Sequence, residues 1–279
     1  MMKKTYYSYS TEPENQENII FPWKKSPKLA GVLPFFTTRL GGVSQGGFSG
    51  FNLGDHVGDD PTHVAMNRAH LLASLAPHAT GLALVNQVHG AEVASTPWEG
   101  LRPDADAVLT HQPGLVAAVL TADCVPVLFA DPDNGIVAAA HAGWRGAVAG
   151  ILENTLQLLE KSGGRRELTW AWIGPCIGPA HYEVTADFRE IIINATQNKI
   201  GMDCQNFFSN EKKSARMLFD LPGYVLARLI KTGLDARQII NLEQCTYALE
   251  SLFFSHRRAV QRHQSPCGRQ MGGILLIPP

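Results

Sequence analysis

The apolar stretches of this chain are short, and few of them alternate with polar residues. Runs such as LVAAVLTA and VPVLFAD join small, branched and aromatic residues without a polar face. This is typical of strands that are buried on both sides. The pattern predicts strands at 32–38, 83–90, 107–110, 115–122, 125–131, 135–142, 168–174 and 272–278.

Apolar residues recur at helical spacing between these runs and predict helices at 60–76, 146–164, 185–196 and 221–234. The second helix is expected to end near Lys161, because Gly163 and Gly164 follow it. Leu221-Pro222 suits the first turn of the fourth helix. We therefore expect a mixed α/β (α+β) domain with a mixed β-sheet core flanked by helices.

The first 18 residues are polar and show no periodicity. This composition predicts a flexible N-terminal arm at 1–18. Residues 19–279 contain no repeat, low-complexity linker or sharp change in composition, so we expect one catalytic domain there.

Composition and charge limit the kinds of partner. The chain has 279 residues, 45% of them hydrophobic, and a formal net charge of −1. A chain without a broad basic field is not expected to bind nucleic acid or an anionic membrane. No apolar run approaches the roughly 18 residues of a membrane helix. Small molecules are the expected partners, and no obligate protein partner is indicated.

The cysteines predict a reducing compartment. Their number is odd, five, none form a C-x-x-C pair, and the first residues lack the apolar segment of a secretion signal. We therefore expect a cytoplasmic location and no disulfide framework.

Three residues with metal-binding side chains interrupt the predicted strands: His89, Cys124 and His141. The turn sequence DPDNG at 131–135 predicts a hairpin that brings Cys124 and His141 together, while His89 comes from a separate strand. One thiolate and two imidazoles suit a catalytic zinc site with its fourth position left to water. The spacing alone is weak evidence, since a buried cysteine is also a common small hydrophobe.

Charged residues near these positions are candidates for the chemistry. Asp123 could orient a ligand imidazole or shuttle a proton, or it could only cap the local backbone. Arg145 precedes a predicted helix and could hold an anion, as could Arg39 on the turn before Gly41-Gly42. The alternative for Arg145 is a plain surface salt bridge, and for Arg39 a position on the surface. The basic run at 255–263 is expected to be a solvated loop, and Cys176 to have a packing role.

Several ordered motifs carry a resemblance to a known family. They are TTRLGGVSQGGFSGFNLGDHVGDDPTHVAMNR (37–68), NQVHGAEV (86–93), DADAVLT (104–110), TADCVPVLFAD (121–131), AAAHAGWRG (138–146), WIGPCIGPAHYEV (172–184), CTY (245–247), FFSHRR (253–258) and CGRQMGGI (267–274). From about residue 20 onward the chain resembles the laccase-domain, YfiH-like family, once called multicopper polyphenol oxidoreductases. The resemblance implies that His89, Cys124 and His141 bind one zinc.

The resemblance also implies an activity. Members of the family are described as purine nucleoside phosphorylases that act on adenosine, inosine, guanosine and methylthioadenosine with phosphate, and that also deaminate adenosine. Arg39 and Arg145 are then the expected anion holders, with Asp123 near the metal. Polyphenol oxidation is an older attribution. It requires several coppers, whereas this chain offers one Cys-His cluster, although copper could replace zinc there.

Two other hypotheses remain open. In the first, Cys124 is a nucleophile and His141 its base, as in a cysteine hydrolase or amidase. The fold has been grouped with cysteine-dependent toxins that deamidate proteins (CNF-like), and editing of peptidoglycan precursors has been suggested for the family. In the second, the protein is a metal-stabilised binding module, which would unfold when the metal is removed.

Overall fold

The computed structural model describes residues 19–21, 29–200, 202–210 and 217–278. The arm expected at 1–18 lies outside them. The described helices are α1 Pro61–Ser74, α2 Trp144–Ala149, α3 Ile151–Lys161, α4 Ala186–Ile200, α5 Leu221–Lys231 and α6 His256–Gln261. The strands are β1 Val32–Phe36, β2 Gly81–Ala83, β3 Val93–Ser95, β4 Ala107–Thr110, β5 Leu115–Thr121, β6 Val125–Asp131, β7 Ile136–Ala142, β8 Trp170–Ile173, β9 Glu183–Val184, β10 Phe208–Asn210, β11 Met217–Phe219, β12 Ile239–Asn241 and β13 Gln270–Leu276.

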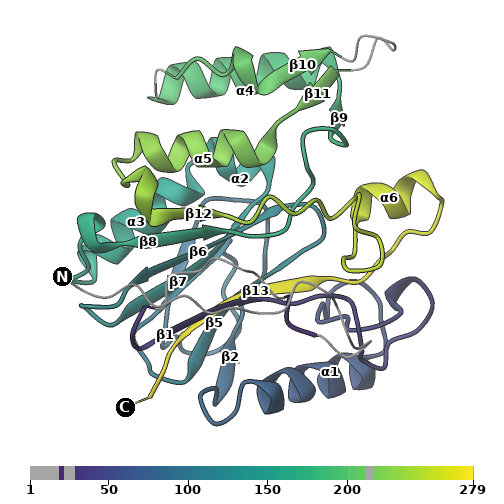
Figure 1. The fold of residues 1–279 in the computed structure, drawn as a ribbon, viewed down its shortest axis with the longest axis vertical. Helices are drawn as coiled ribbons and strands as arrows, with labels where there is room; N and C mark the ends of the chain where they lie inside the picture. Colours follow the sequence, from purple (N-terminus) through teal and green to yellow (C-terminus); the bar gives the residue numbers. More distant parts are fainter. Residues whose placement is uncertain (1–18, 22–28, 201, 211–216, 279) are drawn as a thin grey trace.

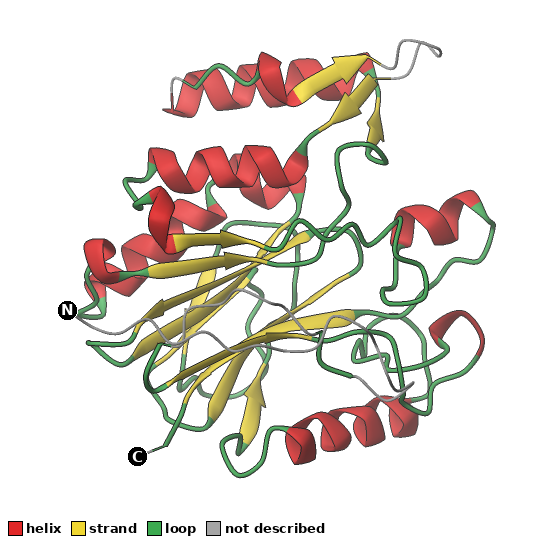
Figure 2. Cartoon of the chain, in the orientation of Figure 1, coloured by secondary structure: helices red, strands yellow, loops and turns green. Residues whose placement is uncertain are grey.

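Two mixed sheets pack face to face, with helices on their outer sides (Figures 1 and 2). Within the described residues, one sheet has the order β12-β8-β6-β7-β4-β3 and the other β1-β13-β5-β2. Helices α2, α3 and α5 cover the first sheet, α1 covers the second, and α4 lies beyond α5 beside the small sheet β10-β11-β9 (Figure 1). The predicted mixed α/β class is confirmed.

The missing alternation in the central strands follows from this layering. Along β6, Val127 and Phe129 pack with the helices, while Leu128 and Ala130 pack between the two sheets. Every residue of β5 from Val116, and every residue of β6 and β7, is buried. A strand with a core on both faces has no polar face to show in the sequence.

Two expectations about elements were wrong in detail. The helix expected at 146–164 is broken, because Gly150 adopts a left-handed φ of 108° between α2 and α3. Only Ala83 of the strand expected at 83–90 is in a strand, the end of β2. The rest is a loop in which His89 has a φ of 60°, a conformation incompatible with a strand.

None of the described helices is long and apolar enough to span a lipid bilayer.

Candidate metal centre

The three residues with metal-binding side chains that interrupt the predicted strands converge in space. The ligand atoms of His89, Cys124 and His141 all lie within 4.8 Å of one another. Cys124 directly precedes β6, His141 lies near the end of β7, and His89 comes from the loop between β2 and β3. The predicted β6–β7 hairpin is confirmed by its register, which pairs Pro126 with His141.

Gly143 makes room for this cluster. It follows β7 at the position opposite Cys124, and a Cβ atom there would lie 3.1 Å from Cys124 Sγ and 3.2 Å from His89 Cδ2. Such a contact is tighter than most Cβ atoms tolerate. The absence of a side chain at this position therefore lets the thiol and the imidazole approach each other.

The backbone is strained on both sides of the cluster. His89 has a φ of 60° and Asp123, directly before Cys124, a φ of 92°. Residues with a Cβ rarely adopt this conformation, and where they do the surrounding structure must hold them there. The strain thus coincides with the turns that present two of the three ligands.

Asp106 orients two of the ligands from a fully buried position at the start of β4. Its Oδ1 lies 2.8 Å from Nδ1 of His141, which leaves Nε2 for a metal. The same carboxylate accepts hydrogen bonds from the backbone N–H groups of His89 (3.0 Å) and Gly90 (2.6 Å). Burial raises the pKa of Asp106, but His141 and these N–H groups outweigh it, so the pKa falls below its usual value.

The electrostatics of the cluster favour a thiolate. Burial raises the pKa of Cys124, but the imidazoles of His141 and His89 outweigh it and lower the pKa to about 6. Burial lowers the pKa of His141, while Cys124 and Asp106 raise it more strongly. A deprotonated sulfur at neutral pH is the form that binds a metal or attacks an electrophile.

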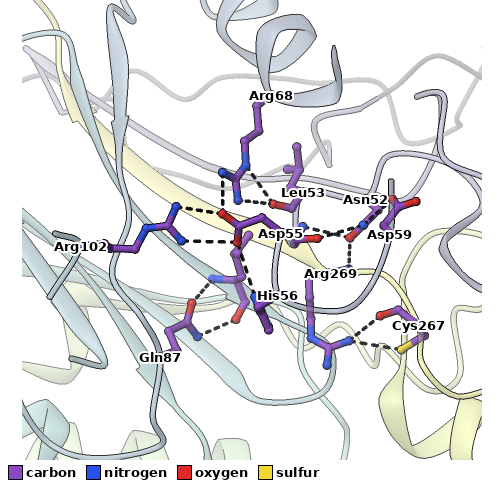
Figure 3. A network of polar contacts seen from close by, with 12 residues as sticks. Asn52, Leu53, Asp55, His56, Asp59, Arg68, Gln87, Arg102, Cys267 and Arg269 are labelled. Atoms are coloured by element: carbon purple, nitrogen blue, oxygen red, sulfur yellow. Dashed lines mark hydrogen bonds and ion pairs between the residues drawn. The ribbon is translucent and has the colours of Figure 1, made fainter. Parts of the chain in front are cut away.

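The loop that carries His89 is clamped to β5. The Gln87 side chain donates to the carbonyl of Leu120 and accepts from its N–H, both at 2.8 Å. Figure 3 shows the Gln87 side chain with its two hydrogen bonds. Beyond an isolated backbone bridge between Asn86 and Asp104, side-chain contacts hold this segment in place of the expected strand pairing.

A cavity of about 140 Å³ opens beside Cys124. Its other lining residues are Ala122, Asp123, Trp144, Ile177, Tyr182, Leu221, His256 and Arg257. Arg257 lies over the ring of Tyr182 at 5.1 Å and donates to the carbonyl of Glu183 at 2.8 Å. The basic run at 255–263, expected to be a solvated loop, therefore includes a helix, α6, and contributes two residues to this cavity.

The carboxylate of Asp123 is held by the segment that leads into α6. It accepts hydrogen bonds from Thr246 Oγ1 (2.7 Å), Ser255 Oγ (3.0 Å) and the Arg257 backbone N–H (2.7 Å). Asp123 lines the cavity beside Cys124, and its carboxylate fixes that segment. The carboxylate hydrogen-bonded to the His141 ring is that of Asp106, which the sequence reasoning did not single out.

The two candidate anion holders lie apart from this cavity lining. Arg39 donates to the carbonyl of Ser49, stacks over Phe254 at 4.6 Å and lines a different cavity of about 470 Å³. Arg145 is exposed and stacks over Trp144, whose ring does line the cavity beside Cys124. Arg257 is the arginine that lines it directly, and the sequence pointed to it only through the basic run and the motif FFSHRR.

The donor set fits a metal ion. Two imidazole nitrogens and a sulfur with a lowered pKa lie within 4.8 Å of one another, and Asp106 fixes the orientation of one ring. Three soft or borderline ligands with one open side match zinc, and also copper. The fold and the site thus define a mixed α/β protein with a candidate His/Cys/His metal centre.

Residues 34–277 match the family model described as multi-copper polyphenol oxidoreductase laccase, so the chain belongs to this family. It is 38% identical to the purine nucleoside phosphorylase YfiH of Escherichia coli over 262 residues, which cover 93% of this chain and 99% of that protein. A purine nucleoside phosphorylase of Deinococcus radiodurans is 46% identical over 170 residues, covering 60% and 64%.

Solved structures share the fold. YlmD from Geobacillus stearothermophilus superposes with a TM-score of 0.81 at 30% identity, covering 94% of this chain and all of that one. The hypothetical protein YfiH of Bacillus licheniformis gives 0.78 at 31% identity, covering 88% and 92%. The resemblance stated from the motifs is confirmed.

Proposed function

We propose that the protein is a zinc-dependent purine nucleoside phosphorylase that cleaves adenosine, inosine, guanosine and S-methyl-5′-thioadenosine with phosphate and also deaminates adenosine. The observation that carries the proposal is the convergence of His89, Cys124 and His141, because Cys124 also lines a cavity with aromatic and cationic side chains. Relatives that cover most of this chain are named purine nucleoside phosphorylases, which supports the same activity.

The cavity offers groups suited to a purine and to an anion. Trp144 and Tyr182 line the cavity and supply aromatic rings against which a base can pack. Burial raises the pKa of Tyr182, so its hydroxyl stays protonated and can donate a hydrogen bond. Arg257 and His256 supply hydrogen-bond donors for phosphate. Arg145 lies near the cavity because it stacks on Trp144, one of the lining residues.

In phosphorolysis a phosphate oxygen attacks C1′ of the ribose, the bond from C1′ to N9 breaks, and the base leaves with a proton. The transition state resembles an oxocarbenium ion, so holding phosphate next to it lowers the barrier. In our proposal Arg257 positions the phosphate and the aromatic rings position the base. Zinc held by His89, Cys124 and His141 would supply Lewis-acid chemistry at one end of the cavity.

The experiment combines metal analysis with turnover. Wild type and Cys124→Ala are compared for zinc content and for adenosine turnover with and without phosphate, and adenine, inosine and hypoxanthine are separated. We expect Cys124→Ala to lose one zinc per chain and also to lose the phosphate-dependent release of adenine. Cys204→Ala, a substitution of a buried cysteine packed away from the centre, is the matched control and keeps both. Zinc-loaded wild type that leaves adenosine, inosine and methylthioadenosine intact would refute the proposal.

A cysteine hydrolase is the second candidate, and the lowered pKa of Cys124 next to His141 favours it. The same thiolate serves as ligand or nucleophile, so accessibility in the metal-loaded protein separates the two roles. Iodoacetamide should leave a ligated Cys124 unmodified. Alkylation of Cys124 in zinc-loaded protein would support the hydrolase.

A further inference from the structure

A second cysteine-histidine pair lies outside the candidate metal centre. Sγ of Cys245 is 3.5 Å from Nδ1 of His181. The His181 ring stacks on Tyr247, with centroids 4.7 Å apart and an interplanar angle of 25°. The imidazole is therefore held in place beside the sulfur by packing against a second ring.

Backbone donors complete the surroundings of this sulfur. The N–H groups of Gly178 (3.2 Å) and Ala248 (3.4 Å) both point at Sγ of Cys245. Together with the imidazole, which can accept the thiol proton, they place polar groups around the sulfur where a new bond to oxygen would form. Such an arrangement is more than a packed thiol requires.

The sulfur is also accessible. Cys245 is partly exposed and lines a cavity of about 450 Å³, along with apolar residues such as Pro179, Pro222 and Leu226. This cavity lies on the other side of the 176–178 segment from the one beside Cys124, because Ile177 lines the latter while Cys176 and Gly178 line the former.

We propose that Cys245 and His181 form a reactive thiol site that small hydroperoxides oxidise. The sulfur attacks the terminal peroxide oxygen, an S–O bond forms and the O–O bond breaks. The thiol proton passes to the leaving oxygen with the help of His181. With hydrogen peroxide the products are the sulfenic acid of Cys245 and water, so atoms and electrons balance. The two N–H groups can then hydrogen-bond to the new oxygen.

Cys176 provides an internal comparison. It pairs with Cys245 in an isolated parallel bridge and lines the same cavity, but it is 4% exposed. Burial raises the pKa of its thiol well above the usual value, and the nearby Cys245 adds to this effect. Two thiols at one cavity thus differ in the features on which reactivity depends.

The site is connected to the metal centre by a short path. Thr246, next to Cys245, donates to Oδ1 of Asp123, and the Ile177 N–H donates to the Asp123 carbonyl at 2.9 Å. Asp123 directly precedes the metal-site residue Cys124. Oxidation of Cys245 would therefore add an oxygen to the residue next to Thr246, whose hydrogen bond to Asp123 holds the turn before Cys124.

The test is trapping of sulfenic acid in the metal-loaded full chain, with no nucleoside present. The protein is treated with hydrogen peroxide and dimedone, and the adduct at each cysteine is followed by mass spectrometry. We expect Cys245 to react at least about tenfold faster than Cys176, Cys204 and Cys267. Equal rates at Cys245 and Cys176 in wild type would overturn the proposal without recourse to any variant.

A variant isolates the imidazole. His181→Phe keeps a ring for stacking on Tyr247 but removes the nitrogen, and should slow the oxidation of Cys245 about tenfold, roughly the effect of losing one hydrogen bond. His111→Phe replaces an exposed histidine elsewhere and should leave the rate unchanged. An unchanged rate in His181→Phe would show that the pair is only structural. The readout is independent of turnover, so its outcome and that of the proposed phosphorylase are separable.

Discussion

At the scale of single residues, Asp106 is the carboxylate on which the geometry of the metal centre depends. It fixes His141 through Nδ1 and the His89 turn through the backbone N–H groups of three successive residues, 88–90. Asp106→Asn retains one acceptor but loses the charge and the second acceptor oxygen. Zinc affinity should fall about 10- to 100-fold, as for other carboxylates that orient a ligand histidine. Competition with a fluorescent chelator measures the dissociation constant.

The control for this variant is Asp104→Asn. Asp104 is exposed, lies two residues away and accepts a hydrogen bond from Asn86. Its variant should bind zinc as wild type does. If Asp106→Asn also bound zinc with unchanged affinity, Asp106 would serve only the backbone.

Gly143 gives a second residue-level prediction. Its φ of −65° is open to any residue, so the effect of Gly143→Ala is steric and not conformational. The added methyl group would lie 3.1 Å from Cys124 Sγ and push the sulfur by a few tenths of an ångström. Zinc affinity should fall at least about tenfold, because metal sites tolerate displacements of only about 0.2 Å. The melting temperature of the metal-free protein should change little, and a large drop would instead indicate a packing defect.

The sequence identified the residues that interrupt apolar strands and missed those whose role depends on distant pairing. The proximity of Cys124 and His141 could be predicted because a hairpin turn joins their strands. Asp106 lies within the motif DADAVLT (104–110), but the motif does not mark it as a partner of His141. Its contact with His141 depends on the pairing of β4 with β7, which places Ala107 opposite Ala140. Nothing local to Asp106 encodes that register.

At the scale of elements, Asp55 ties three segments together. It accepts from Arg68 on α1 (3.1 Å) and from Arg102 before β4 (2.9 Å), with His56 beside it (Figure 3). The neighbouring imidazole of His56 is the main factor that lowers the pKa of Asp55 below its usual value, followed by Arg102 and Arg68 and opposed by burial. The ionised carboxylate thus joins the 44–60 loop, α1 and the 101–104 segment.

This lowered pKa fixes the sign of a pH dependence. The folded protein holds the carboxylate ionised at pH values where the unfolded chain binds a proton, so the stabilisation is complete above the ordinary pKa near 4 and is lost as the pH falls further. Asp55→Asn should cost about 1 kcal/mol at pH 7, because the cluster is partly exposed. The difference from wild type should stay constant down to about pH 5 and shrink below about pH 4. Urea unfolding at several pH values measures it.

Asp133→Asn, in the exposed β6–β7 turn, is the matched control and should leave the free energy of unfolding unchanged. A deficit of Asp55→Asn that grew as the pH fell would contradict the assigned role.

Elements were predictable where local signals agreed with the tertiary fold. Pro61 and the Asp60 cap define the start of α1, and Asp220 caps α5 in the same way. The strand expected at 83–90 was wrong because Gln87 and Asp106 hold that segment by side-chain contacts across the sheet. These contacts have large sequence separations, so periodicity alone could not reveal them.

At the scale of the whole molecule, the fold does not depend on a metal for its core. The two large sheets enclose apolar residues such as Phe36, Leu128 and Trp172, and the helices bury two further clusters against their outer faces. His89, Cys124 and His141 sit on turns and a strand end at the margin of these layers. We therefore expect the metal-free protein to remain folded, unlike a binding module that zinc holds together.

Chelation distinguishes a protein that stays folded without metal from a binding module that zinc holds together. Zinc at about 1,000 times its dissociation constant adds about 4 kcal/mol to stability. For a chain of this size that corresponds to about 10 °C in melting temperature. Excess EDTA should therefore lower the melting temperature of wild type by about this amount while the far-UV circular dichroism at 20 °C stays the same. Cys124→Ala should melt at one temperature with or without zinc, because it lacks the thiolate ligand. If chelation instead abolished the circular dichroism at 20 °C, zinc would be part of the folding core, and a primarily catalytic role for the centre would lose its physical basis.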